Sequence, residues 1–279
     1  MPKKIHSFSK LLIKYLVVII LSLIFLFPLY WMLITAIKPE AEIVLFPPKL
    51  FPWPINFKIF GDAWTANNFS LFLLNTLKIA FFNVIFVTIS SSLVAFGFAR
   101  MQFPGKNILF IILLATMMIP YEVQIIPLYI GYKYIGWLNT HLPLIVPSLF
   151  STAYFVFFMR QYMMGIPIDL DEAATIDGCG PFQIWYRIIL PLIKPVLASC
   201  IIFQFLWCWN DFFGPLIFLQ TPDKWTFILG ISALKGDRVY IPWNKMMAIT
   251  TLFSIPPLIV FFLAQDKLIG GLATTGLKN

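Results

Sequence analysis

The side chains best suited to chemistry gather in one acidic stretch, Asp169 to Gly178, of an otherwise mostly apolar chain. A catalytic dyad or a metal site built on histidine would need His6 or His141, and these two are isolated from each other. Three cysteines form an odd set without metal-ligand spacing, and we expect free thiols: Cys179, Cys200 and Cys208. The acids of the stretch therefore call for a structural or mechanical interpretation before a catalytic one.

Local propensities predict a short capped helix in this stretch. Asp169 and Glu172 have the spacing of a capping box, in which the first side chain accepts a backbone N–H and the second reaches back. Asp171 and Glu172 would lie where the helix dipole favours negative charge. About two turns later Gly178 can take the left-handed conformation that ends a helix, and Pro181 can open the next one.

The middle of this helix is unusual, because it carries two alanines, Ala173 and Ala174. Small side chains allow another backbone to approach closely. A compact helix with an acidic tip and a flat small face suits insertion into a cleft of another protein. Pro191 and Pro195 then break or kink the chain beyond it.

The composition of the chain indicates the class of protein to which this helix belongs. The 279 residues are 60% hydrophobic and 11% charged, with a mean hydropathy of +0.87, whereas soluble domains carry about a quarter charged residues. Apolar runs of about 20 residues indicate an all-α membrane protein, and the alternating segments of about ten residues that a β-barrel needs are not found. The net charge of +8 is spread over short loops, as membrane topology requires, and does not indicate a nucleic-acid partner.

Six transmembrane helices are predicted, with both termini in the cytoplasm. A basic N-terminus (1–14) precedes the first helix (15–37), and a proline-rich extracytoplasmic loop (38–70) follows it. The remaining five helices lie within 71–265, interrupted by a cytoplasmic loop at 161–195, and a cytoplasmic tail (266–279) ends the chain. The expected spans are 15–37, 75–99, 107–119, 142–159, 196–219 and 246–265.

The long loop carries a family resemblance. Glu172-Ala173-Ala174, three residues, Gly178, nine residues, Ile188, one residue and Leu190-Pro191 together resemble the loop signature of the membrane subunits of bacterial ATP-binding-cassette importers. Flanking segments such as Ile126–Tyr129 and Trp209–Phe212 are similar to the carbohydrate-importing branch and, within it, to the smaller, maltose-type permease.

The resemblance implies a type I importer permease fold in the bacterial inner membrane. It implies three kinds of protein partner besides the lipid bilayer: a second homologous permease, two ATPase subunits and an extracytoplasmic sugar-binding protein. The loop helix would be the coupling helix seated in an ATPase cleft. The coupling residues that it implies are Asp169, Asp171, Glu172, Ala173, Ala174, Asp177, Gly178, Leu190 and Pro191.

This chain offers no phosphate-binding loop of its own. Its Gly-Lys pair, Gly105-Lys106, is followed by Asn107 rather than by serine or threonine. We therefore expect ATP and Mg²⁺ to bind to the partner ATPase, and no cofactor to bind to this chain.

Polar residues within the spans suggest where a substrate would pass. Asn210 and Asp211 are costly in a membrane, and sugars stack on aromatic rings and bond to amides and carboxylates. The predicted path residues are Gln204, Trp207, Trp209, Asn210 and Asp211. The alternative places Asp211 in water at the outer end, with the tryptophans in the interfacial belt and Gln204 in an interhelical hydrogen bond.

Glu122 and Gln124 lie between Pro120 and Pro127 and are candidates for an outer gate. The alternative is a simple kink whose acid reaches water.

The expected function is transport of a sugar or sugar derivative, with glycerol-3-phosphate or a polyol as the alternative substrate. An intramembrane enzyme would need paired acids or a His/Ser/Lys set inside the spans, which they do not offer. A stand-alone carrier or channel would not need the coupling helix.

Overall fold

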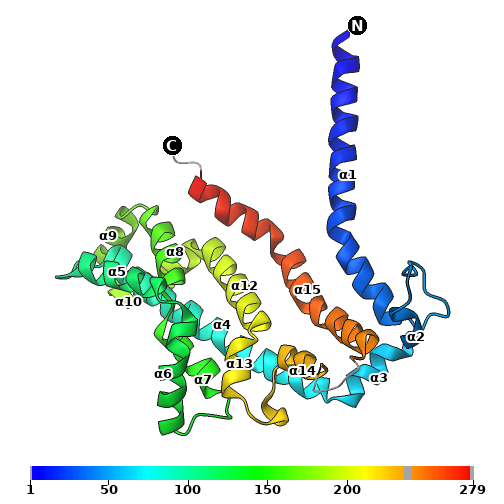
Figure 1. Ribbon diagram of the computed structural model, residues 1–279. Coiled ribbons are helices and arrows are strands. Elements are labelled where there is room, and N and C mark those ends of the chain that lie inside the picture. The colour runs from blue at the N-terminus through cyan, green and yellow to red at the C-terminus, as the bar shows by residue number, and fades with distance from the viewer. Residues whose placement is uncertain (1, 236–240, 277–279) are drawn as a thin grey trace. The chain divides into compact units, whose positions relative to one another are not determined.

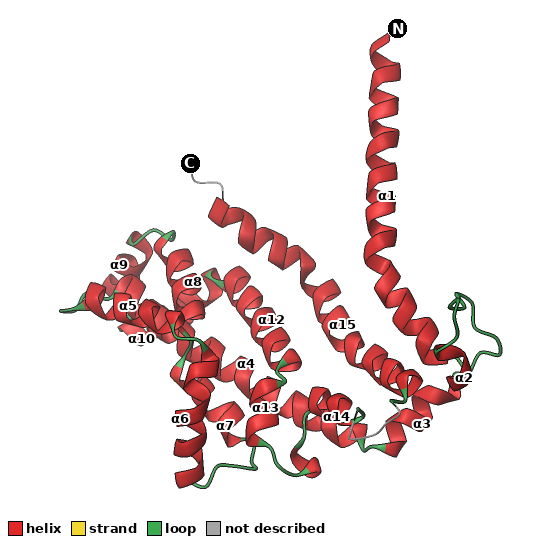
Figure 2. Cartoon of the chain, in the orientation of Figure 1, coloured by secondary structure: helices red, strands yellow, loops and turns green. Residues whose placement is uncertain are grey.

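The computed structural model describes residues 2–235 and 241–276, with side chains for residues 10–235 and 241–265, and every regular element in these ranges is a helix (Figures 1 and 2). Within these described ranges, four helical segments are long and apolar enough to cross a membrane: Lys10–Ile37, Phe69–Arg100, Leu142–Met164 and Trp243–Gln265. Two bent helix pairs bring the number to six if each pair is one span. The all-helical prediction is confirmed for these residues, and the six expected spans overlap these four segments and two pairs, with different bounds for the third and fifth.

The chain divides into two compact units. The first comprises residues through Phe69 together with Ile231–Ile255, and the second comprises Ser70–Gly230 with the residues from Pro256 onward. The sixth predicted span is α15 (Trp243–Gly276), whose helix continues past Gln265 through most of the predicted tail; residues 277–279 of that tail lie outside the described part.

The first unit contains α1 (Pro2–Ile37) and two helices within the predicted loop 38–70, α2 (Glu40–Ile43) and α3 (Lys58–Ala66). The prolines of this loop exclude a spanning helix, as predicted, but α3 still forms because it buries an apolar face. Ile59 of α3 packs with Ala36 and Ala248.

The core of the second unit forms where α4 (Phe69–Arg100) meets α8 (Ala153–Met164) and the segments after residue 180. Phe96 of α4, Met159 of α8 and Ile189 are all buried in this one cluster. The fourth predicted span consists of α7 (Leu142–Ile145), the 3₁₀ turn η2 (Val146–Phe150) and α8, which continues four residues beyond Arg160. Because α4 contains no proline, it runs unbroken for 32 residues.

Proline breaks the third predicted span, but only once. α5 (Lys106–Ala115) and the short turn η1 (Thr116–Met118) meet α6 (Tyr121–Tyr134) at a bend of 95°, ahead of which Pro120 has extended geometry. Pro127 lies inside α6 without ending it. An interior proline removes one backbone hydrogen bond and can leave a kinked helix rather than end it.

The fifth predicted span differs most from the structure. The chain runs through α10 (Pro181–Ile184), the π-helical η3 (Trp185–Ile189) and α11 (Leu190–Leu192), then bends by 82° into α12 (Lys194–Asn210). The predicted helix 196–219 is wrong beyond Asn210, because Asp211 is extended and a separate helix, α13 (Phe213–Phe218), follows. The Asp211 carboxylate accepts the Gly214 N–H at 3.1 Å, which stabilises the start of the new helix. η4 (Pro222–Lys224) and α14 (Phe227–Ala233) complete the order of elements.

Candidate functional site

The predicted loop helix exists as α9 (Asp169–Ile176), eight residues long. Its N-terminus differs from the prediction, because the residue before it, Ile168, is already in the helical region and no side chain caps the helix. The Glu172 N–H donates to the Ile168 carbonyl at 3.2 Å. The capping box at Asp169 and Glu172 is therefore wrong, although both acids lie in the first turn, where the helix dipole favours them.

The C-terminus of α9 matches the prediction. Gly178 has a φ of +84°, the left-handed conformation. The Cys179 N–H donates to the Ala174 carbonyl at 2.9 Å, and the Gly178 N–H donates to the Thr175 carbonyl at 3.0 Å. These two bonds make a Schellman motif, which satisfies carbonyls that the helix end would leave open.

The two faces of α9 are chemically different. Asp171 and Ala174 are buried against the rest of the second unit, and Ala174 belongs to its apolar core. The predicted flat face of two alanines is therefore wrong: Ala174 is small because its own chain packs against it, while Ala173 is exposed. The outward face combines acids with apolar surface and consists of Asp169, Glu172, Ala173 and Ile176, with Asp177 and Gly178 exposed at its end.

Ile176 is 86% exposed and Phe182 in α10 is 62% exposed, so apolar surface continues beside the acids. Pro191 is also exposed, whereas Leu190 lies partly against the core. We call the exposed residues Asp169, Glu172, Ala173, Ile176 and Phe182 the α9 face.

The buried side of α9 is linked to the end of α4. The Arg100 Nε lies 3.3 Å from the Asp171 Oδ2, and the two side chains are 6% and 12% exposed. Arg100 also donates to the Ile166 carbonyl at 3.0 Å. Burial raises the pKa of the Asp171 carboxyl above its ordinary value, and the Arg100 guanidinium opposes that shift.

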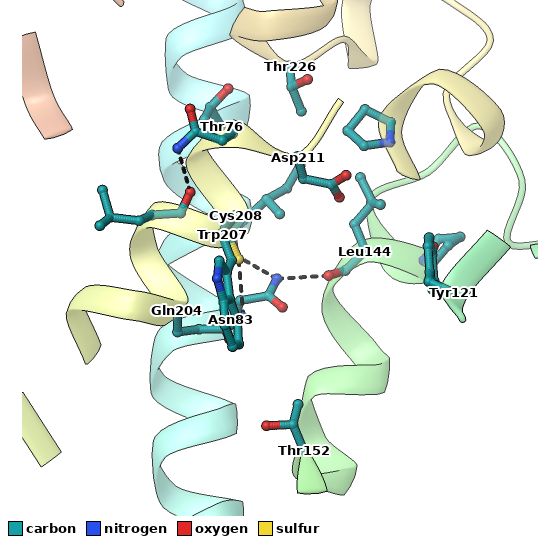
Figure 3. A pocket seen from close by; sticks show the side chains of 15 residues that line it. Thr76, Asn83, Tyr121, Leu144, Thr152, Gln204, Trp207, Cys208, Asp211 and Thr226 are labelled. Atoms are coloured by element: carbon teal, nitrogen blue, oxygen red, sulfur yellow. Dashed lines mark hydrogen bonds between the residues drawn. The ribbon is translucent and has the colours of Figure 1, made fainter. Parts of the chain in front are cut away.

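The second unit also holds a cavity of about 790 Å³ (Figure 3). Its walls come from α4, α6, α7, α12, α13 and the segments that join them. The lining residues are Thr76, Ile79, Asn83, Tyr121, Pro143, Leu144, Thr152, Gln204, Leu206, Trp207, Cys208, Asn210, Asp211, Pro215 and Thr226.

The structure brings four of the five predicted path residues to this cavity: Gln204, Trp207, Asn210 and Asp211. The fifth, Trp209, does not line it. Trp209 is fully buried and its ring lies 5.5 Å from that of Phe205. Two residues along a helix correspond to a rotation of about 200° around its axis, so Trp207 and Trp209 lie on nearly opposite sides of α12 and do not both face the cavity.

The predicted gate residues lie away from the cavity wall. Glu122 is exposed in the first turn of α6, and the Gln124 side chain donates to the Ile119 carbonyl at 3.0 Å. Tyr121 is the residue of this segment that lines the cavity. A gating role for Glu122 and Gln124 stays a prediction.

Several polar wall residues were missed from the sequence, and Asn83 is the most informative. Its side-chain amide donates to the Ile79 carbonyl at 2.9 Å and to the Leu144 carbonyl at 2.8 Å, which fixes α7 against α4 (Figure 3). An asparagine in the middle of an apolar span was the signal available for it. Gln204 donates to the Cys208 Sγ at 3.3 Å, within α12, rather than to another helix as the alternative interpretation held.

The charge of the cavity wall has one sign. Asp211 is its carboxylate, and the lining residues given above include no lysine, arginine or histidine. Among the residues whose side chains the structure describes, no group of three or more histidines, cysteines and acids could hold a metal ion. The wall offers amides, hydroxyls, one indole face and one acid, a set that can hydrogen-bond and stack with a polar, uncharged molecule.

Membrane-length helices around a largely apolar cavity that carries several polar groups, with a short helix that exposes one face, are the features of a membrane transport subunit. A family described as "Binding-protein-dependent transport system inner membrane component" matches residues 88–272, which include both α9 and most of the cavity wall, and the chain belongs to this family. It is accordingly an inner membrane protein of the permease type.

The relatives carry permease names. The chain is 36% identical to a probable ABC transporter permease protein of Pyrococcus horikoshii, over 90% of this chain and 92% of the relative. It is 34% identical to an arabinooligosaccharides transport system permease of Bacillus subtilis, over 93% and 92%. It is 32% identical to an sn-glycerol-3-phosphate transport system permease of Yersinia pestis, over 92% and 94%.

A solved structure has the same fold. A chain of a bacterial ABC transporter involved in the import of the acidic polysaccharide alginate superimposes with a TM-score of 0.82, covering 91% of this chain and 95% of that one, at 22% identity. At this identity the likeness concerns the fold.

Proposed function

We propose that this chain forms half of the translocation path of an importer for a neutral sugar or oligosaccharide, and that the α9 face couples it to an ATPase. In this proposal α9 and both termini lie in the cytoplasm, a second permease completes the path, two ATPase subunits bind ATP and Mg²⁺, and an extracytoplasmic binding protein delivers the sugar.

One observation carries the coupling role: α9 is held by its buried side and exposes acids and apolar side chains on the other. Ile176 and Phe182 would otherwise face water with most of their surface, and exposed apolar surface beside charged groups is typical of a docking site. A basic partner surface would complement Asp169 and Glu172. A second solved structure with this fold, at a TM-score of 0.69 and 19% identity, is a bacterial alginate ABC transporter in complex with an alginate pentasaccharide-bound periplasmic protein, which supports an assembly of this kind.

The cavity supports an uncharged substrate over an anionic one. Trp207 is 48% exposed and can stack on a sugar ring, while the amides of Gln204 and Asn210 can bond to hydroxyls. Glycerol-3-phosphate would bring a phosphate beside Asp211, where the wall of this chain supplies no cation to offset the repulsion. The relatives are named for neutral oligosaccharides and for glycerol-3-phosphate, so their names do not choose between the two substrates. The charge of the cavity wall is the feature of this chain that favours the neutral one.

Uptake into proteoliposomes tests the proposal. The chain is reconstituted with its partner permease, ATPase and binding protein, and uptake of arabinotriose, diacetylchitobiose and glycerol-3-phosphate is measured with and without ATP. We expect ATP-dependent uptake of a neutral saccharide. Uptake that persists without the ATPase, or that is confined to glycerol-3-phosphate, would contradict the proposal.

Two matched pairs of variants test the two sites separately. Trp207→Ala should reduce uptake while Trp207→Phe, which keeps an aromatic face, retains more of it. Glu172→Lys should weaken ATPase binding, whereas Asp62→Lys, an equal change of charge at an exposed acid of α3, should not. Equal binding of the ATPase by Glu172→Lys and Asp62→Lys would remove the coupling role of the α9 face.

A further inference from the structure

The ion pair between Arg100 and Asp171 joins the two sites described above. Arg100 is the last residue of α4, and the same helix carries Thr76, Ile79 and Asn83 in the cavity wall. Asn83 and Arg100 are 17 residues apart, which corresponds to about 25 Å along an α-helix. One side chain at the end of α4 therefore connects α9 to a wall of the cavity far away from it.

α4 is suited to carry a displacement over that distance. It is unbroken from Phe69 to Arg100, whereas α5 with α6 and α10–α11 with α12 are bent by 95° and 82°. A bend at a proline can absorb a movement by changing its angle, but a continuous hydrogen-bonded helix moves as a rigid body. Of the helices that supply the cavity wall, α4 also lies directly against α9 through a charged contact.

The contact between α4 and α9 combines this pair with apolar packing, since Ala174 of α9 lies in the same buried cluster as Phe96 of α4. Beside the ion pair lies a second cavity, of about 360 Å³, lined by residues of both helices that include Phe96, Arg100, Asp171 and Thr175. On this side of α9 the second cavity leaves the ion pair as the contact that the structure shows between the two helices. Arg100 spans the space, contacting Asp171 in α9 and the Ile166 carbonyl in the segment before it.

The position of Asp171 within α9 gives the link its direction. Asp171 is buried in the unit, whereas Glu172 and Ile176 of the α9 face are exposed. The Thr175 hydroxyl donates to the Asp171 carbonyl at 2.7 Å, within the helix. Because α9 is a short hydrogen-bonded helix, a displacement of its outer face also moves the Asp171 carboxylate, and the ion pair carries that movement to Arg100.

We propose that Arg100 and Asp171 are positioning residues that fix α9 to α4, so that displacement of α9 by the ATPase moves the cavity wall at Asn83. This inference rests on the proposed coupling role of α9. It assigns the pair to transmission of movement, not to binding of the ATPase or of the sugar. Breaking the pair leaves the α9 face able to dock, but lets α9 move without α4.

The quantity that tests this is the number of sugar molecules transported per ATP hydrolysed in the reconstituted complex, measured per assembled complex with the saccharide that the wild type takes up. Asp171→Asn keeps the shape of the side chain and removes its charge, and Arg100→Gln removes the other charge. We expect each variant to bind the ATPase like the wild type and to lower the transport ratio by about fivefold or more, the lower end of typical coupling between sites. Asp62→Asn is the control, since it neutralises an exposed acid in the other unit.

The double variant separates a shared role from two independent ones. If the residues act as a pair, Arg100→Gln with Asp171→Asn lowers the ratio no further than the worse single variant. The inference would be overturned if the double variant lowered the transport ratio by the product of the two single effects, or if Asp171→Asn alone kept the wild-type ratio. Failure of Asp171→Asn to assemble with the ATPase would overturn it too, because the pair would then be needed for folding or docking.

Failure of this inference is distinguishable from failure of the proposed function. If Glu172→Lys weakens ATPase binding while Asp171→Asn transports normally, α9 docks but the ion pair does not transmit. If Glu172→Lys has no effect on ATPase binding in the same preparations, the coupling role itself is wrong and the inference falls with it.

Discussion

Gly178 offers the sharpest test of how the end of α9 is built, because its substitution isolates one physical effect. Its φ is +84°, and a Cβ added there would meet no atom within 4 Å. Any cost of a side chain is therefore a cost of backbone conformation and not of a clash. For an L-residue the left-handed region costs about 1–2 kcal/mol, more for a β-branched residue and less for asparagine.

The matched control lies two residues away. Gly180 likewise has open space around its Cβ position but has an ordinary φ of −76°. Gly180→Ala should be nearly neutral, whereas Gly178→Val should weaken the docking of the α9 face on the ATPase. In the free permease a substituted residue 178 can leave the left-handed conformation, whereas docking on the ATPase would require that conformation. The free energy of binding should therefore weaken by about 1–2 kcal/mol, a factor of about 5 to 30 in affinity.

The assay is the dissociation constant of the ATPase from the permease pair held in lipid nanodiscs. We expect the losses to follow the order Gly178→Val, Gly178→Ala, Gly178→Asn, with Gly180→Ala close to the wild type. The reasoning is refuted if Gly178→Val and Gly180→Ala bind the ATPase equally well, or if Gly178→Asn loses as much affinity as Gly178→Val.

Three further predictions concern the cavity and its surroundings. Gly214→Ala should reduce uptake, because a Cβ there would come within 2.8 Å of the Asp211 carboxylate and move it; unchanged uptake would show that the position of Asp211 does not matter. Asn83→Ala should lower the free energy of unfolding by about 0.5–1.5 kcal/mol, since it removes the hydrogen bond that joins α4 to the Leu144 carbonyl of α7, and denaturation followed by tryptophan fluorescence measures this. Burial lowers the pKa of His141, so the unfolded chain binds its proton first and stability should fall as the pH drops below about 6.5; a thermal melting series in which His141→Gln shows the same pH dependence would contradict this.

Features that depend on neighbouring residues along the chain were predictable. The break at Pro120, the short α9 and its end at Gly178 follow from backbone geometry, which the local sequence sets. The capping box at Asp169 failed although it too is local. The chain leading into α9 is already helical at Ile168, so Asp169 has no extended position from which to cap.

Features that depend on distant partners were not predictable in the same way. Ala174 and Asp171 were assigned with Glu172 to a docking surface, yet they face inward, to the core and to Arg100, 71 residues earlier in the chain. The spacing of the motif shows only that these residues are close together. Which of them face outward depends on the side of α9 that α4 covers.

The sequence by itself determined that this chain is a helical membrane protein of the importer permease family, because hydropathy, proline positions and motif spacing are properties of the chain read in order. The tertiary structure alone decided that Trp207 lines a cavity while Trp209 is buried, and that Asp171 faces Arg100 while Ala174 joins the core. These outcomes depend on hydrogen bonds and packing between segments far apart in sequence, whose partners exist only once the helices have come together.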